Sequence, residues 1–290
     1  MYAKYLETFL RDLPLGESFD ILERKIVIGG HDASIFFVDG LTDGVKTQYI
    51  LNYLLSIKER DMSHVLSSKQ FLEEKLPYLD SHIIDDCKLA EQRMYSGLSV
   101  MIIEGFDQIF VMDTREYPGR SVEEPEKEKS LRGAKDGFTE NFMENVSLIR
   151  RRIRDNNLVI RYFPVGEVSK TDIAIGYMKN KVDKKLLQRL ESQLKNLQME
   201  YVTVGDQSLL ESLMKSIGAY SPINPFPKVR YSQRPDIISS HIEEGKIAII
   251  VDNSPTVMLL PVSVFDFLQD VDDYYFPQLT GNYFRLIRLV

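Results

Sequence analysis

A repeated pattern of glycine and apolar residues constrains the fold of this chain more than any other feature of its sequence. When Gly97 is placed on Gly245, 148 positions further on, the next fifteen residues align without a gap. The apolar run 100–103 then faces 248–251, and 109–112 faces 257–260. Either a true duplication or the similarity of any two helix-strand-strand units explains the match. Both readings predict α/β architecture with two similar small subdomains.

Apolar periodicity and turn residues define the elements expected in the first half. The pattern predicts helices over 1–13, 44–58, 67–76 and 87–95, and strands over 25–28, 33–38, 82–84, 98–103 and 108–112. Asp43 or Thr42 can cap the second helix. We expect that helix to bury an apolar face that includes Val45, Tyr49, Leu51, Leu54 and Leu55.

The second half repeats the order of the first. Strands are expected over 158–165, 172–178, 201–204, 229–231, 247–251 and 256–260, and helices over 182–197, over 208–217 and from Pro235. The first of these helices is expected to bury Val182, Leu186, Leu187, Leu190, Leu194 and Leu197. The 32–38 segment resembles 172–178, and a long helix follows each.

These elements predict a division of the chain into five parts. They are an N-terminal helix (1–14), α/β subdomain 1 (15–116), a connector (117–154), α/β subdomain 2 (155–262) and a juxtamembrane helical tail (263–290). The connector begins as a charged loop, passes an Arg132-Gly133 turn and becomes a helix that ends in three arginines. It is expected to join the two subdomains.

Composition narrows the class of protein. The 290 residues are 43% apolar and 27% charged, as in an ordinary globular protein. A net charge of −7 disfavours nonspecific binding to nucleic acid. Cys87 is the only cysteine, so no disulfide can form within the chain, and a reducing compartment is expected. No signal peptide is expected at the N-terminus, and no window reaches the roughly 18–20 apolar residues of a membrane helix.

The sequence offers no catalytic, cofactor-binding or metal-binding constellation. Its four histidines are scattered, and none has a second ligand at metal-binding spacing. Gly29 and Gly30 are expected in a hairpin turn rather than a phosphate-binding loop. Cys87 has no histidine signal nearby, which favours a structural thiol. The arginine cluster, with members Arg150, Arg151, Arg152 and Arg154, can either contact phosphate or lipid headgroups or complement the negative end of a helix dipole.

The tail combines aromatic residues with two arginines. Arg285 and Arg288 lie three residues apart, among the aromatic and aliphatic residues of 274–290. Aromatic residues and arginine typically flank a membrane helix on its cytoplasmic side. We therefore expect these two arginines to be juxtamembrane and a membrane span to follow Val290.

The connector carries a family resemblance. Its EP…E…RG…GF.E…N..LIRRRI pattern is similar to the signature of the A subunits of bacterial spore germinant receptors, the GerA family. The matching positions are Glu124, Pro125, Glu128, Arg132, Gly133, Gly137, Phe138, Glu140, Asn145 and the run 148–153, which contains Arg150, Arg151 and Arg152. Ala134 departs from the proline common in receptor subunits and favours a sporulation-protein branch over a nutrient receptor. The resemblance extends over essentially the whole chain.

The resemblance implies a location, partners and a role. Such proteins have an N-terminal cytosolic domain of two lobes like those of solute-binding proteins, and they reside in the spore inner membrane with this domain facing the cytoplasm or spore core. They form oligomeric complexes, here expected to include copies of the same protein and other membrane subunits, and the complexes resemble ion channels. The expected role is noncatalytic assembly or gating through the connector residues. The alternative is a module that senses a small molecule between the lobes.

Overall fold

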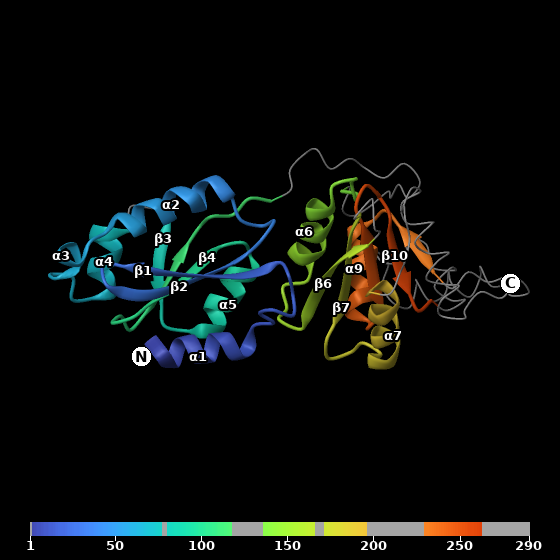
Figure 1. Ribbon diagram of the computed structural model, residues 1–290, viewed down its shortest axis with the longest axis horizontal. Helices are drawn as coiled ribbons and strands as arrows, with labels where there is room; N and C mark the ends of the chain where they lie inside the picture. The colour runs from blue at the N-terminus through green and yellow to red at the C-terminus, as the bar shows by residue number, and fades with distance from the viewer. Residues whose placement is uncertain (1, 77–79, 118–135, 166–170, 196–228, 263–290) are drawn as a thin grey trace, which may run out of the picture. The chain divides into compact units, whose positions relative to one another are not determined.

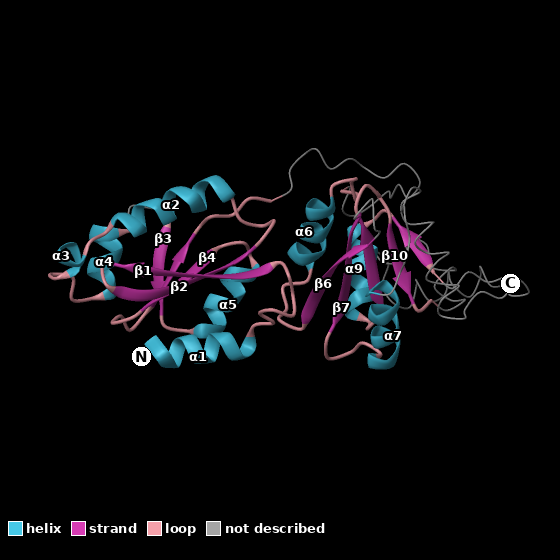
Figure 2. Cartoon of the chain, in the orientation of Figure 1, coloured by secondary structure: helices cyan, strands magenta, loops and turns pink. Residues whose placement is uncertain are grey.

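The computed structural model describes the chain except for residues 1, 77–79, 118–135, 166–170, 196–228 and 263–290 (Figure 1). Its contacts divide the chain into two compact units. Unit 1 comprises Met1–Pro118 and Arg154–Asn156, and unit 2 comprises Gly119–Ile153 and Asn157–Val290. Each unit is built on one five-stranded sheet with helices packed against it (Figure 2). The domain limits expected from the sequence stay a prediction.

Unit 1 holds an antiparallel sheet in the order β1-β2-β4-β5-β3. Its strands are β1 (Ile21–Ile28), β2 (His31–Val38), β3 (Ser81–Ile84), β4 (Ser99–Ile103) and β5 (Ile109–Met112). Its helices are α1 (Tyr2–Asp12), α2 (Gly44–Ser56), α3 (Glu59–Met62), α4 (Ser68–Lys75) and α5 (Cys87–Tyr95).

Helices cover both faces of this sheet (Figure 1). One core packs under α1 and α5 and includes Phe9, Phe36 and Met94, whereas the other packs under α2 and α4 and includes Leu54 and Phe71. All residues of β4 and β5 are consequently buried. This two-sided burial explains why these strands are continuous apolar runs in the sequence rather than alternating ones.

Unit 2 holds a second antiparallel sheet in the order β6-β7-β9-β10-β8. Its strands are β6 (Leu158–Val165), β7 (Thr171–Met178), β8 (Arg230–Ser232), β9 (Ile247–Val251) and β10 (Val257–Leu260). The described helices are α6 (Phe142–Arg152), α7 (Lys184–Lys195) and α9 (Pro235–Glu243). Pro164 lies in β6, at the sheet edge, where a missing backbone N–H costs least. The predicted elements 201–204 and 208–217 fall outside the described residues.

The two sheets share one register, which confirms the two similar subdomains. Val100 pairs with Val111 in unit 1, and Ala248 pairs with Leu259 in unit 2, so both partners are displaced by the predicted 148 positions. The pairing of β3 with β5 and that of β8 with β10 keep the same displacement. The similarity therefore extends beyond the fifteen aligned residues, to strands β3 and β8 and to helices α5 and α9, which follow them.

Two expectations from the sequence need correction. Strand β1 begins at Ile21 rather than at residue 25, because it pairs along all of β2, with Ile21 opposite Val38. The expected buried face of 44–58 is also wrong in part. Leu54 is fully buried and Leu51 is partly buried, as expected, but Val45, Tyr49 and Leu55 are exposed, and Ile50, at 7% exposed, packs into the core instead. The sheet receives only one side of a helix, and α2 carries apolar residues on more than one side.

Candidate functional site: the segment around helix α6

The described part of the family-like segment is residues 136–153, here called the α6 segment. Asn141 caps α6 by accepting a hydrogen bond from the Glu144 N–H at 3.1 Å. Thr139 Oγ1 donates to a Glu144 carboxylate oxygen at 3.0 Å and accepts from the Asn141 N–H at 3.2 Å. These reciprocal bonds fix where the helix begins, because they satisfy backbone donors that an isolated helix start leaves free.

Asn145 is the buried polar centre of the α6 segment. It is completely buried, and its Oδ1 accepts from the Thr139 N–H at 2.8 Å. Its Nδ2 donates to the carbonyl oxygens of Thr139, at 2.6 Å, and Ser254, at 3.4 Å. A side-chain amide carries a donor and an acceptor on separate atoms, so Asn145 can bond to a backbone N–H and to backbone carbonyls at once. Asn145 therefore ties the loop before α6 to the loop between β9 and β10.

Backbone hydrogen bonds attach the same loop to the residues before α9 and, a second time, to the loop between β9 and β10. The Phe138 N–H donates to the Gln233 carbonyl at 2.8 Å, and the Asn253 N–H donates to the Glu140 carbonyl at 3.0 Å. Phe138 is only 6% exposed, and Gly137 is also buried. Helix α6 itself packs on α9 and β9.

The arginines that end α6 differ in their surroundings. Arg150 is completely buried and donates to the Leu158 carbonyl at 3.1 Å. Arg152 donates to the Leu148 carbonyl at 2.9 Å, in the last turn of the helix, and pairs with Asp136. Arg151 is exposed. The contact of Arg152 agrees with the reading in which a cation complements the end of the helix, whereas Arg150 bonds to the first residue of β6.

Several predicted residues have no described position. Glu124, Pro125, Arg132 and Gly133 precede the α6 segment, and Arg285 and Arg288 belong to the tail, all outside the described residues. Gly137, Phe138, Glu140, Asn145 and the three arginines are brought together in one loop and helix of unit 2. The sequence did not single out Thr139, Asn141 or Ser254, since only the fold shows that their polar atoms meet Asn145 or the start of α6.

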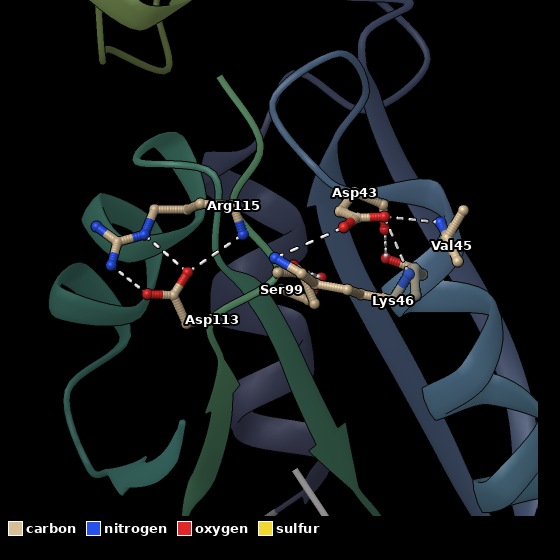
Figure 3. A network of polar contacts seen from close by, with 8 residues as sticks. Asp43, Val45, Lys46, Ser99, Asp113 and Arg115 are labelled. Atoms are coloured by element: carbon tan, nitrogen blue, oxygen red, sulfur yellow. Dashed lines mark hydrogen bonds and ion pairs between the residues drawn. The ribbon is translucent and has the colours of Figure 1, made fainter. Parts of the chain in front are cut away.

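Unit 1 contains a separate polar network where β5 ends (Figure 3). Arg115 holds the Asp113 carboxylate through two guanidinium bonds, the Nε bond measuring 2.8 Å. The buried hydroxyls of Ser99 and Thr114 lie 2.7 Å apart. The Thr114 carbonyl accepts from the Asp43 N–H at 2.7 Å, so the network also fixes the start of α2.

The titratable groups of unit 1 fall into two kinds. Hydrogen bonding from Arg115 lowers the pKa of Asp113, and the backbone N–H of Lys46 lowers that of Asp43, so both stay ionised. Burial raises the pKa of the Cys87 thiol, with a further rise from Asp86, which keeps it protonated and a poor nucleophile. Burial and the nearby Asp12 also raise the pKa of Glu91.

Unit 2 buries a second set of basic side chains that the sequence did not reveal. Arg234 is 1% exposed, and its guanidinium makes a two-pronged contact with Asp236, with oxygen distances of 3.1 and 2.7 Å. His241 is completely buried, with Arg230 at 3.4 Å from its Nε2 and Glu244 at 3.0 Å from its Nδ1. Across the described ranges, no three His, Cys, Asp or Glu side chains are grouped so that they could hold a metal ion.

Comparison with known proteins assigns the chain to a family. The sequence model described as "Bacillus/Clostridium GerA spore germination protein" matches residues 9–290. The chain belongs to the GerA family. Among GerA relatives, stage V sporulation protein AF of Bacillus subtilis (strain 168) is 33% identical over 293 residues, covering 99% of this chain and 57% of that protein. Spore germination protein A1 of the same organism is 30% identical, covering 94% of this chain and 55% of that protein.

A solved structure supports the fold of the GerA chain. The crystal structure of the N-terminal domain of the A subunit of the Bacillus megaterium spore germinant receptor GerK3 matches with a TM-score of 0.63 at 24% identity. The match covers 89% of this chain and 93% of that one. The chain spans a little over half the length of the two curated relatives described above. In the part of the chain that the structure describes, no helix is long and apolar enough to cross a lipid bilayer.

Proposed function

We propose that this chain acts without catalysis, in the assembly or gating of an oligomeric, ion-conducting membrane complex used in spore germination. Two observations support the setting. The family is one of spore germination proteins, and one relative, 26% identical, is named as an uncharacterized membrane protein of Bacillus subtilis. In this proposal the chain is the N-terminal, cytosolic part of a protein of the spore inner membrane, with other membrane subunits as its partners.

The observation that carries the proposal is how the α6 segment uses its polar residues. Asn145 and Arg150 are buried and bond to backbone carbonyls of unit 2, and Arg152 bonds to a helix carbonyl and to Asp136. Side chains engaged in this way hold a loop and a helix in one conformation. A segment built to be rigid, with Arg151 exposed at its end, suits a docking surface better than a reactive site.

The test exchanges the charge of Arg151 in the full-length protein. We expect Arg151→Glu to reduce co-purification of the other membrane subunits from spores and to slow germination, because a docking contact would lose its cation. Lys195→Glu is the matched control, since Lys195 is an exposed basic residue in the last turn of α7 in the same unit. Thermal unfolding of both variants shows whether the fold is retained.

Two results would contradict this role. One is equal recovery of the complex and equal germination with Arg151→Glu and Lys195→Glu. The other is a saturable thermal shift of the unaltered chain with an amino acid or a sugar, which would favour the alternative role of a sensing module. The expected part of Arg132 in assembly is tested in the same way with Arg132→Ala, read against the same control.

A further inference from the structure

Helix α2 presents apolar side chains to solvent. Its outward face, as used below, consists of four residues that keep 65%, 72%, 39% and 54% of their surface exposed, namely Val45, Tyr49, Tyr53 and Leu55. The first three are spaced by four residues and therefore share one side of the helix. Ile50 and Leu54, on the opposite side, pack into the core of unit 1. The fold of unit 1 leaves this outward face uncovered within the described residues.

Helix α7 of unit 2 is the structural counterpart of α2. Asp43 accepts hydrogen bonds from the first N–H groups of α2, and Asp183 does the same for α7. The two caps lie 140 positions apart, the displacement that also relates Ala33 in β2 to Ile173 in β7. The position of each helix after its hairpin is therefore the same in both units.

The two helices agree on their inward side and differ on their outward side. Ile50 and Leu54 correspond to Leu190 and Leu194, which are also buried. The outward face of α2 corresponds instead to the polar residues Lys185, Arg189, Gln193 and Lys195. The fold thus places no demand for valine, tyrosine or leucine at these positions. No described residue covers this face, and contact with another molecule is a physical reason for a helix to keep an apolar outward face.

We propose that the outward face of α2 packs against the same face of a second copy of this chain. This contact rests on the proposed assembly role and specifies one surface through which copies of the chain would meet. Charge favours this occupant. The chain carries a net charge of −7, so its copies repel one another, and this repulsion is weakest where the contact surface itself carries no charge. Residues 47–56 contain no charged side chain, and Lys46, just before them, is paired with Asp43 at 3.5 Å.

The polar residues beside this face also suit contact with an identical surface. Gln48 and Asn52 are exposed and hydrogen-bonded to each other at 3.0 Å, one turn apart. A two-fold contact brings a surface against itself, so it must avoid like charges and needs groups that both donate and accept. Side-chain amides and tyrosine hydroxyls do both. A lipid surface is less well matched, because helices that bind membranes carry lysine and arginine beside their apolar face.

The test uses disulfide trapping of the chain in a Cys87→Ser background. Tyr49→Cys places a thiol on the outward face of α2, and Arg189→Cys places one at the equivalent position of α7. Under mild oxidation we expect a covalent dimer with Tyr49→Cys and at least about tenfold less with Arg189→Cys. Equal trapping at both positions, or none at Tyr49→Cys, would overturn the proposal.

A second measurement does not depend on cysteine chemistry. The triple variant Val45→Lys, Tyr49→Arg, Tyr53→Gln gives α2 the residues of α7, all of which have helix propensities at least as good as those they replace. Sedimentation equilibrium should show self-association of the unaltered chain weakened about tenfold or more in the variant. Unchanged association would overturn the proposal, and circular dichroism reports whether α2 is retained.

The same triple variant in the full-length protein separates this inference from the proposed function. If complexes with other subunits survive while contacts between copies are lost, both proposals stand. If the variant leaves contacts between copies intact, the inference about α2 fails although the assembly role can still hold. Trapping of Tyr49→Cys to a protein of different mass would show that another subunit, rather than a second copy, covers this face.

Discussion

Gly97 and Gly245 occupy equivalent positions against equivalent backbone oxygens. Both have positive φ, +90° and +100°, and a Cβ on either residue would lie 2.8 Å from a carbonyl oxygen, that of Leu41 or that of Lys181. Leu41 and Lys181 are themselves separated by the 140 positions that relate the two hairpins. The same close approach between a helix end and the loop after a hairpin is therefore built twice in the chain.

Alanine at either glycine should destabilise the unit that contains it. The positive φ alone costs about 1–3 kcal/mol for a residue with a Cβ, and the contact with the carbonyl adds to it. Gly44→Ala is the control, because a Cβ there meets nothing within 4 Å and alanine favours a helix. Chemical unfolding measures the loss, and hydrogen exchange shows which unit opens. A loss no larger than that of Gly44→Ala would contradict the steric reading.

Removal of the Asn145 amide should loosen the α6 segment. Asn145→Ala leaves the N–H and C=O of Thr139 without their side-chain partners, which costs about 1–3 kcal/mol where such groups are shielded from water. Gln188→Ala, at an exposed position of α7, should change the free energy of unfolding by much less. Faster hydrogen exchange at the Thr139 amide would locate the effect, and unaltered exchange there would contradict it.

The carboxyl group of Glu91 should make the stability of unit 1 depend on pH. Burial and Asp12 raise the pKa of Glu91 in the folded chain above its ordinary value. Its contribution to the free energy of unfolding is therefore fully present below the ordinary pKa and is lost as the pH rises through the folded pKa. In the unaltered chain a Glu91 carboxylate oxygen accepts from Asn156 Nδ2 at 2.9 Å. Glu91→Gln keeps an acceptor oxygen at this place, but its side chain cannot ionise. Urea unfolding should show this variant more stable than the unaltered chain near neutral pH, with the difference vanishing toward about pH 4. An equal difference at both pH values would contradict this reading.

The buried hydroxyl pair of Ser99 and Thr114 should show strong coupling. Either Ser99→Ala or Thr114→Val leaves one buried hydroxyl without its partner, at a cost of about 1–3 kcal/mol. The double variant removes both hydroxyls and should be less destabilised than the sum of the single variants. The equivalent residues of unit 2, 148 positions further on, are Ile247 and Val262. The same fold therefore accepts two apolar residues at these positions. Additive losses in a double-mutant cycle would exclude coupling between the two hydroxyls.

Much of the strand pattern was predictable because buried strands leave a strong signal. The runs 100–103 and 248–251 are continuous apolar segments, since helices cover both sheet faces, and the glycines before them mark helix ends. The start of β1 was predicted too late because charged residues interrupt its pattern, and pairing with β2 rather than composition makes it a strand. The short helix α3 was missed for a related reason, since four residues are too few to show a helical period.

The family-like segment illustrates what sequence and structure each contribute to the site. Its residues identified the family without any coordinates, because the spacing of Gly137, Asn145 and the arginines is specific. The burial of Asn145 and Arg150 could not be predicted, since their partners include the carbonyls of Ser254 and Leu158, which only folding brings to them.

The sequence by itself determined the duplicated α/β pattern, the family and the absence of disulfides within the chain, because each depends on residue identity and order. The tertiary structure decided which side of α2 faces the core. Val45 and Tyr49 belong to residue types that helices often bury, so the sequence pattern did not separate them from Leu54, and the expected face was wrong in part. The rotation of α2 about its own axis decides which of its residues are exposed. The Asp43 cap and the packing on the sheet set this rotation, and no local sequence pattern encodes it.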